Sequence, residues 1–457
     1  MEITNIAYVV GAVCFILGIK MLSHPRTARK GNGIASLGML IAIVATLTAG
    51  EVLDFKMIGI AILIGSIIGG IIAQKIEMTQ MPQMVAIFNG LGGGASALVA
   101  SAEFFSQYNK EPSTFLLVTI ILSVFIGTLT LTGSFIAFGK LQGFISGKPI
   151  VFPAQQLFNA LVLISIFTLG YFILGNPLDL NLFYGVLLAS AILGITLTIP
   201  IGGADMPVVI SLLNSYSGIA AAATGFVLMN NALIISGALV GASGLILTQI
   251  MCKGMNRSLQ NVIFGAVGGD VSVSSGDVQE LNIKSYSTEE AAMIFDAAEK
   301  IVIVPGYGLA VAQAQHAARE VGEWLESQGK TVLYAIHPVA GRMPGHMNVL
   351  LAEANIPYEQ LKDLDEINPE FEDCDVALIL GANDVVNPAA RHDKSSPIYG
   401  MPILNVDKAR TVIVNKRSMN PGFAGIQNEL FGYDNTIMVF GDAKDMLNQL
   451  LSDFKEL

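Results

Sequence analysis

The sequence predicts a polytopic α-helical membrane domain followed by a doubly wound parallel-sheet domain. The 457 residues are 53% hydrophobic and only 13% charged, with a mean hydropathy of +0.61, whereas soluble domains carry about 25% charged residues. Residues 1–260 hold 11 Lys/Arg and 8 Asp/Glu, and residues 261–457 hold 14 and 28. Beyond residue 290, short β-branched runs alternate with helical segments. These observations exclude an ordinary cytosolic enzyme, a disordered chain and a disulfide scaffold.

Nine stretches in the first part of the chain meet the requirement for a membrane-spanning helix, about 20 mainly apolar residues. Their predicted bounds are 4–22, 33–50, 57–74, 84–102, 114–139, 156–175, 179–200, 206–228 and 231–252. We therefore expect about nine transmembrane helices within a membrane domain of residues 1–252.

Basic residues predict the orientation of these helices, because Lys and Arg are retained on the cytoplasmic side. Nine of them follow spans one, three, five and nine, namely Lys20, Arg26, Arg29, Lys30, Lys75, Lys140, Lys148, Lys253 and Arg257. Only Lys56 and Lys110 fall on the opposite side. The pattern predicts an N-terminus outside and a C-terminal domain in the cytoplasm.

Few polar side chains lie inside the predicted spans or at their mouths, and such groups are costly in lipid and often mark a pathway. The candidates are Asn89, Asp205, Asn214, Ser215, Asn230 and Asn231. Each amide could equally make an interhelical hydrogen bond. All five histidines lie outside the spans, so a proton path would need a titrating group from a partner.

Residues 253–290 are rich in Gly, Ser and charge and predict a linker, which leaves 291–457 as a cytoplasmic domain. Strands are expected at 300–305, 331–337, 376–380, 411–415 and 436–440, and helices at 310–328, 346–354 and 443–454. This alternation predicts a Rossmann-like parallel sheet. The acidity of the domain argues against nucleic acid as a partner, and no metal-ligand spacing is present.

The first of these strands runs into Pro-Gly-Tyr-Gly-Leu-Ala-Val at 305–311, a variant of the dinucleotide fingerprint in strand–turn–helix context. Gly306 would allow the tight turn, and Gly308 would let the backbone approach a pyrophosphate at the start of a long helix. The alternative is a tight strand–helix connection that binds nothing.

The end of the second strand favours NADP over NAD. An NAD site usually has an acid there for the ribose 2′-hydroxyl, but this strand ends at His337-Pro338 with Arg342 soon after. Lys416 and Arg417, directly after the strand 411–415, form the only adjacent basic pair in the acidic domain. They could bind a 2′-phosphate or be a solvated pair.

Several long motifs, in order along the whole chain, closely resemble the beta subunits of proton-translocating NAD(P) transhydrogenases. They include IGGADMP at 201–207, LNSYSG at 213–218, PGYG at 305–308, HPVAGRMPGHMN at 337–348, GAND at 381–384 and KRSMN at 416–420.

The resemblance implies an oxidoreductase and translocase of the bacterial inner membrane. This chain would bind NADP(H), and alpha subunits would carry the NAD(H) domain and further membrane helices in a dimer of heteromers. Hydride would pass between the nucleotides, coupled to inward proton flow.

The resemblance also implies roles for individual residues. Gly306, Tyr307, Gly308, Ala310 and Val311 would contact the pyrophosphate region. Lys416 and Arg417 would hold the 2′-phosphate, with Arg342 near the nucleotide. Asp384 would lie at the nicotinamide end, Asp205 in a coupling loop, and Asn230 would match a functional amide.

One position departs from some relatives, which have a proton-carrying histidine where this chain has Asn89. Our hypothesis is that Asn89 lines the proton path while a partner helix supplies the titrating group. The competing class of protein is a channel or transporter gated by a cytoplasmic nucleotide-sensing domain. Against it stand the missing selectivity-filter sequence and the full-length motif match.

Overall fold

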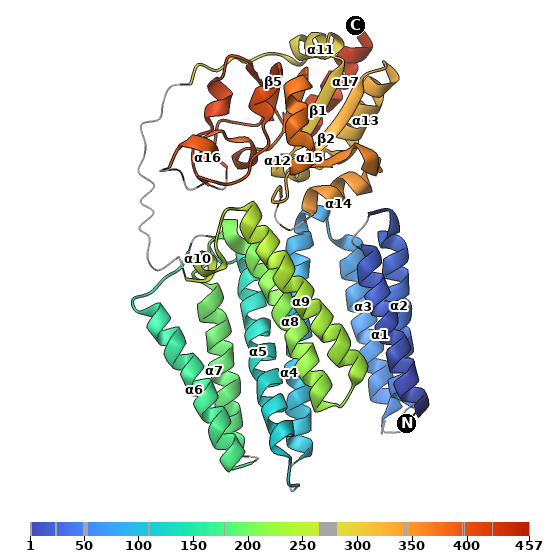
Figure 1. Cartoon of the computed structure of the whole chain (residues 1–457), viewed down its shortest axis with the longest axis vertical. Coiled ribbons are helices and arrows are strands. Elements are labelled where there is room, and N and C mark those ends of the chain that lie inside the picture. Colours follow the sequence, from blue (N-terminus) through green and yellow to red (C-terminus); the bar gives the residue numbers. More distant parts are fainter. Residues whose placement is uncertain are drawn as a thin grey trace. The chain divides into compact units, whose positions relative to one another are not determined.

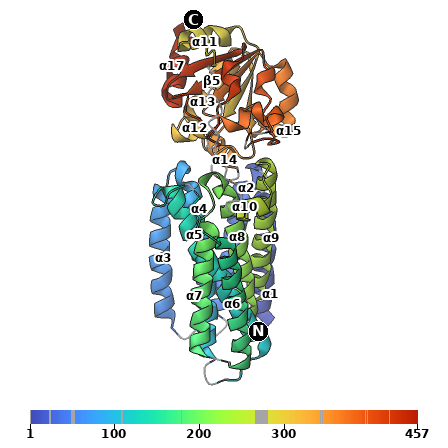
Figure 2. The same ribbon diagram turned by 90° about the vertical axis from the view of Figure 1, so that its left-hand side faces the viewer.

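The computed structural model describes residues 2–22, 25–48, 54–107, 110–147, 149–177, 179–264, 281–341, 343, 345–394, 396, 398–422 and 424–456. These residues form two compact units, one of long helices and one built around a sheet (Figures 1 and 2).

The helical unit confirms the prediction of nine apolar helices, counted over the described residues. Their bounds are α1 Glu2–Leu22, α2 Pro25–Thr48, α3 Phe55–Lys75, α4 Met81–Ser106, α5 Thr114–Gln142, α6 Gln155–Gly175, α7 Leu180–Thr198, α8 Met206–Val227 and α9 Asn231–Gly254. Helix α2 begins eight residues before the predicted span, because proline at the first helical position needs no hydrogen-bonded N–H and a hydropathy criterion ignores a polar first turn. The orientation of the helices stays a prediction.

Side chains cap several of these helices and satisfy backbone N–H groups that have no partner within the helix. Asp54 accepts hydrogen bonds from the N–H groups of Lys56 and Met57 at 3.0 and 3.1 Å. Asp179 caps α7 in the same way, 2.9 Å from the nitrogen of Asn181. The two carboxylates therefore mark helix starts at the ends of spans.

Glycines set how closely the helices of this unit approach. A Cβ built on Gly127 of α5 would lie 2.5 Å from the carbonyl oxygen of Gly93 on α4. One on Gly218 of α8 would lie 2.4 Å from the nitrogen of Gly241 on α9. Side chains larger than hydrogen do not fit there, which is the small-residue packing that membrane helices use. Helix α3 differs, since none of its side chains is buried and a Cβ added to any of its four glycines would meet no atom of another described segment within 4 Å.

The second unit contains a six-stranded parallel sheet of order β3-β2-β1-β4-β5-β6, which confirms the predicted doubly wound fold. Its strands are β1 Lys300–Pro305, β2 Thr331–Ile336, β3 Leu361–Asp363, β4 Val376–Leu380, β5 Thr411–Lys416 and β6 Thr436–Phe440. The strand order reverses between β1 and β4, so the loops after these strands flank the crevice where such sheets bind ligands.

Helices cover this sheet and bury its central strands. Helices α11 Thr288–Asp296, α13 Gln315–Ser327 and α17 Ala443–Glu456 pack together. Val302 and Val304 alternate along β1. They belong to a hydrophobic core that also contains Ile367 and Phe371 from the segment after β3. Central strands buried on both faces explain their nearly continuous apolar sequences.

The division of the chain at residues 252 and 290 stays a prediction. Most of the Gly- and Ser-rich run that predicts the linker lies outside the described residues. Within the proposed linker, α10 spans Leu259–Phe264 and α11 begins at Thr288, where Ser287 and Glu290 form a reciprocal capping box.

The glycine contacts lead to a prediction about packing in the membrane unit. Gly218→Ala should destabilise the chain by about 1–3 kcal/mol, because the new methyl group would overlap the backbone of Gly241. Gly65→Ala on α3 is the matched control and should leave stability unchanged, since nothing lies within 4 Å of that position. Thermal loss of monodisperse protein in detergent measures both, and equal melting of the two variants would contradict the packing assignment.

Candidate functional site

The loops after β1 and β4 are joined backbone to backbone at the carboxyl edge of the sheet. The N–H of Gly306 donates to the carbonyl of Leu380, and the N–H of Gly308 donates to that of Gly381, both at 2.9 Å. A Cβ on Gly306 would lie 2.3 Å from the Cα of Ala382, and one on Gly308 would lie 2.6 Å from the Cα of Gly381. Both fingerprint glycines are therefore required by this loop contact.

This contact corrects the reason predicted for Gly306. Its φ of −119° is extended backbone open to any residue, so the tight turn does not require glycine there and the space beside Ala382 does. Gly381 does adopt the left-handed region, at φ +66°. That conformation favours glycine on the β4 side of the contact.

The long helix predicted after the fingerprint is wrong: two helices occupy its place. Helix α12 spans only Tyr307–Val311, and α13 begins at Gln315. Gln313 between them adopts a left-handed φ of 52°, and the N–H of Ala314 bonds to the carbonyl of Leu309 at 3.1 Å. A helix of five residues has a much weaker dipole than the long helix invoked for pyrophosphate binding.

The predicted pyrophosphate residues face different surroundings. Ala310 is fully buried, Val311 is 39% exposed, and Tyr307 is half-buried. The ring of Tyr307 lies 6.4 Å from the ring of buried His346. Val311 and Tyr307 are therefore the side chains of this set with accessible surface, while Ala310 can contribute only packing or backbone.

Lys416 and Arg417 lie where β5 ends, at the same edge of the sheet as the fingerprint loop. Arg417 is exposed, whereas Lys416 is half-buried, with its ammonium donating to the carbonyl of Asn420 at 2.9 Å and lying 4.9 Å from the ring centre of Phe431. Burial lowers the pKa of Lys416, and the charge of Asp384 opposes that shift.

Asp384 connects the loop after β4 with the loop after β5. One of its carboxylate oxygens accepts a hydrogen bond from the N–H of Ala424 at 2.9 Å. A Cβ on Gly422 would lie 2.6 Å from its other oxygen, so glycine gives this carboxylate its space. The structure thus brings Asp384 close to Lys416. The sequence alone could not predict this, because the two residues lie on different elements. Arg342 lies outside the described residues.

The opposite side of the crevice carries negative charge that the sequence reasoning missed. Asp363 ends the three-residue strand β3, in register with Ile336 at the end of β2. Asp365 and Glu366 follow it, and these neighbours add to partial burial in raising the pKa of Asp363. Lys362 offsets one charge by pairing with Glu366 at 3.9 Å. The three-residue length of β3 left no periodic signal from which to predict it.

His337, the first residue after β2, is fully occupied by structural hydrogen bonds. It is 1% exposed, its Nδ1 accepts from the N–H of Val339 at 3.2 Å, and its Nε2 lies 2.7 Å from the carbonyl oxygen of Pro402. Because Nδ1 accepts, Nε2 carries the proton and donates to Pro402. Burial lowers the pKa of His337 to about 4. The side chain is therefore neutral near pH 7.

The polar residues predicted in the membrane unit have separate local roles. Asn89 on α4 is buried and donates to the carbonyl of Ile210 on α8 at 3.1 Å. Asn230 accepts from the N–H of Leu233 at 3.1 Å and so caps the start of α9. Ser215 donates to the carbonyl of Gly241 at 2.7 Å, and Asp205 ends the short turn Gly203–Asp205 before α8. Within the described part of the chain, these three predicted residues lie on different elements: Asn89 on α4, Asp205 in the turn before α8 and Asn230 at the start of α9.

Sequence reasoning used Lys140 only to orient the spans, but its side chain is buried, at 5% exposed. Its ammonium donates to the carbonyls of Ile199 and Ile201 at 2.5 and 2.8 Å. These carbonyls follow α7, where a cation is favoured by the helix dipole. Lys140 therefore holds the segment that leads to Asp205, a long-range contact without a local sequence signal.

His337 leads to a prediction about pH. The unfolded chain takes up a proton near pH 6.5, whereas the folded protein resists protonation until about pH 4. Neutral His337 therefore makes its full contribution to the free energy of unfolding above pH 6.5. This contribution, about 3 kcal/mol in all, is lost as the pH falls towards 4. His337→Gln, which cannot titrate, should lack this component of the acid destabilisation.

The fluorescence of Trp324 can measure this effect in the full chain. Trp324 is the only tryptophan and stacks on Phe454 of the sheet unit at 4.4 Å, with the rings 6° from parallel. Urea unfolding at pH 7 and pH 4.5 gives the free energies. The same pH dependence in wild type and His337→Gln would rule out His337 as its source.

Comparison with known proteins assigns this chain to a family. The family described as NAD(P) transhydrogenase beta subunit matches residues 4–453. The NAD(P) transhydrogenase subunit beta of Rhodospirillum rubrum is 52% identical over 458 residues, which cover 98% of each chain. The corresponding protein of one named strain of that species gives the same values. The chain thus belongs to the NAD(P) transhydrogenase beta subunit family.

Proposed function

We propose that this chain is the subunit of a proton-translocating transhydrogenase that binds NADP(H) at the carboxyl edge of its sheet. The observation that carries the proposal is the charge difference across the crevice. Lys416 and Arg417 lie at the end of β5, whereas Asp363, Asp365 and Glu366 gather beyond β2. A phosphate is attracted to the first side and repelled from the second.

The residues at the end of β5 fit the 2′-phosphate of NADP(H). Arg417 is exposed and offers a planar set of donors for bidentate binding. Lys416 is held in place by Asn420 and Phe431, so little side-chain entropy is lost on binding. The adenosine end would then lie over β4 and β5, because the 2′-phosphate is attached to the adenosine ribose.

The remaining predicted contacts follow from this placement. Tyr307 and Val311 would provide accessible surface beside the pyrophosphate, and the backbone of Gly306 and Gly308 would shape its wall. Asp384 would keep the loop after β5 closed against the loop after β4, through its hydrogen bond with Ala424. Its predicted location at the nicotinamide end does not fit this placement, because Asp384 lies beside Lys416 and so near the adenosine end. The role of Arg342 stays a prediction.

NADP(H), when bound, supplies the chemistry of hydride transfer, and the chain positions it and excludes water. The single fingerprint in this chain leaves no second nucleotide site. NAD(H) would therefore be bound by an alpha subunit, whose existence the name of the relatives implies. A dimer of such heteromers in the bacterial inner membrane, with the sheet domain in the cytoplasm, completes the proposal.

Proton translocation would use the helical unit. Asn89 is a buried amide on α4 that donates to the carbonyl of Ile210 on α8, and the proton path would pass beside it. It cannot titrate, so an ionisable side chain from the alpha subunit would carry the proton. Lys140 of α5 holds the segment after α7, and this segment leads to Asp205. The segment is therefore a candidate for coupling proton movement to nucleotide binding.

The 2′-phosphate assignment predicts a change in nucleotide preference. Lys416→Gln/Arg417→Gln should weaken NADPH binding roughly 10- to 100-fold, because two charge-assisted hydrogen bonds are lost, and should leave NADH binding unchanged. Energy transfer from Trp324 to the reduced nucleotide measures both affinities in the full chain.

A control for this variant removes the same charge at the other end of β5. Lys408→Gln/Arg410→Gln breaks the ion pairs with Glu372 and Asp375 and should retain the preference for NADPH. Equal affinity of the wild type for NADH and NADPH would contradict the proposal and favour a nucleotide-gated channel or transporter.

The proton-path hypothesis predicts a separation of two activities. In a chain reconstituted with an alpha subunit, Asn89→Leu should abolish proton pumping while NADPH binding to the sheet domain persists. Asn159→Leu, which removes another buried amide, on α6, is the control and should pump normally. A pH-sensitive dye inside vesicles reports pumping. Unchanged pumping in Asn89→Leu would remove Asn89 from the path.

A further inference from the structure

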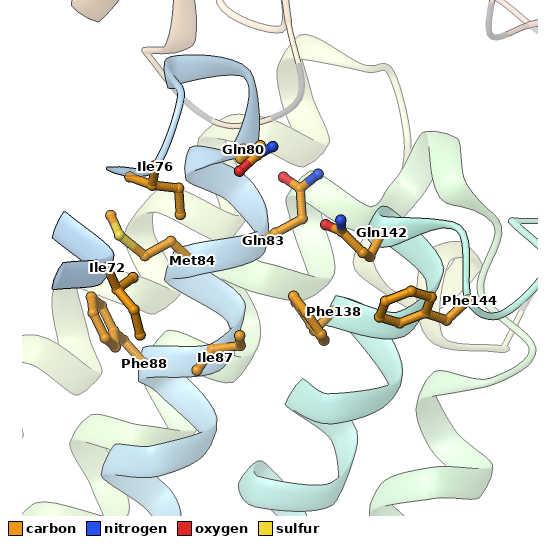
Figure 3. Close-up of a pocket in the computed structure, with 10 residues that line it drawn as sticks. All are labelled: Ile72, Ile76, Gln80, Gln83, Met84, Ile87, Phe88, Phe138, Gln142 and Phe144. Carbon is orange, nitrogen blue, oxygen red and sulfur yellow. The ribbon is translucent and has the colours of Figure 1, made fainter. Parts of the chain in front are cut away.

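A pocket of about 230 Å³ lies between α3, α4 and α5 of the helical unit, and none of the residues assigned to nucleotide binding lines it. Figure 3 shows its three glutamines in the upper part of the view, beside Ile76 and Met84, and the remaining apolar side chains below them. The lining residues are Ile72, Ile76, Gln80, Gln83, Met84, Ile87, Phe88, Phe138, Gln142 and Phe144.

The pocket lies where membrane spans end. Helix α3 ends at Lys75, α4 begins at Met81, and α5 ends at Gln142. Residues at such positions meet the interfacial region, where lipid headgroups join acyl chains. The pocket therefore combines an apolar cavity at hydrocarbon depth with a polar rim at headgroup depth.

Gln83 places a buried amide group in the lining of this pocket. The residue is only 7% exposed, and its amide nitrogen donates weakly to the carbonyl of Leu141 at 3.5 Å. Its carbonyl oxygen is buried and has no hydrogen-bond partner among the described residues. A buried acceptor without a donor is unfavourable, so an occupant with an N–H or O–H donor would be stabilised there.

The lining of the pocket suits the two ends of a lipid molecule. Its apolar side chains, among them Ile72, Ile87 and Phe138, can contact an acyl chain, and its glutamines can contact a headgroup.

The charges at the rim are of both signs. Lys75 and Glu77 are exposed and flank Ile76, which lines the pocket. Thr79 donates to the carboxylate of Glu77 at 3.4 Å. A zwitterionic headgroup matches this pair, with its phosphate near Lys75 and its ammonium near Glu77 and the glutamine oxygens.

We propose that this pocket binds one phospholipid with a zwitterionic, primary-ammonium headgroup. One acyl chain occupies the apolar pocket, and the ammonium donates to the carbonyl oxygen of Gln83. The lipid then packs against Ile87 and Phe88, which directly precede Asn89 on α4. It also covers part of α3, whose side chains are all left unburied by the chain itself.

Native mass spectrometry of the delipidated full chain tests this proposal, with phospholipids of identical acyl chains added as probes. Phosphatidylethanolamine should bind saturably at one site, roughly tenfold more tightly than phosphatidylcholine, whose quaternary ammonium has no donor. Gln83→Leu should retain binding but lose this preference. Equal affinity of the wild type for the two lipids, or no saturable site, would overturn the proposal.

A pair of matched double variants tests the location. Met84→Phe/Ile87→Phe adds bulk inside the pocket and should abolish the site. Leu161→Phe/Ile164→Phe makes a comparable change at the same spacing on the exposed face of α6 and should keep it. Elution profile and circular dichroism verify folding independently of nucleotide binding. Retention of the lipid by a folded pocket-filled variant would place it elsewhere and contradict the proposal.

Assembly with an alpha subunit provides the last arm of the test. The lipid should remain bound in the complex, because the proposal assigns the pocket to a lipid and not to a partner helix. Loss of the lipid on assembly would show instead that a partner side chain fills the pocket, and the lipid site would be rejected. Neither result depends on which nucleotide the sheet domain binds.

Discussion

The site depends on one backbone contact, the hydrogen-bonded approach of the loop after β1 to the loop after β4. Gly308 and Gly381 come so close that neither has room for a side chain. The contact lies where the strand order reverses, so it sets the floor of the crevice. Because both loops are held there, the next loop, after β5, can be positioned through Asp384 and Ala424. Glycine is needed at these positions before any nucleotide is considered.

Electrostatics then distinguishes the two sides of the crevice. The basic pair at the end of β5 and the carboxylates beyond β2 differ in sign, although the domain as a whole is acidic. Net charge alone would suggest that the domain repels an anionic nucleotide. The charges close to the site determine whether an anionic nucleotide binds, because electrostatic interactions beyond about 10 Å are screened by salt. The acidic balance of the domain and the binding of a phosphate are therefore compatible.

The elements that could be predicted from the sequence are those with a local cause. The nine spans follow from hydropathy, and β1, β4 and β6 were predicted with their observed bounds because buried parallel strands are continuous apolar runs. The break at Gln313 could not be predicted, since left-handed backbone is uncommon for glutamine. Strand β3 was too short to show a period.

The same distinction applies to the candidate site. Lys416 and Arg417 were found from composition and position, which are properties of the sequence. The approach of Asp384 to Lys416 and the burial of Lys140 depend on residues distant in the chain. Hydropathy and spacing carry no information about such contacts, so Lys140 was used only to orient the spans and the function of Gly308 in packing was missed.

The central claim is that the 2′-phosphate of NADP(H) binds at the end of β5. A structure of the full chain with NADP⁺, determined by electron cryomicroscopy, tests it most directly. The account predicts phosphate density within hydrogen-bonding distance of Lys416 and Arg417, with the adenosine over β4 and β5. Density for the 2′-phosphate beyond β2, beside Asp363, would contradict it and would require a different basis for nucleotide recognition.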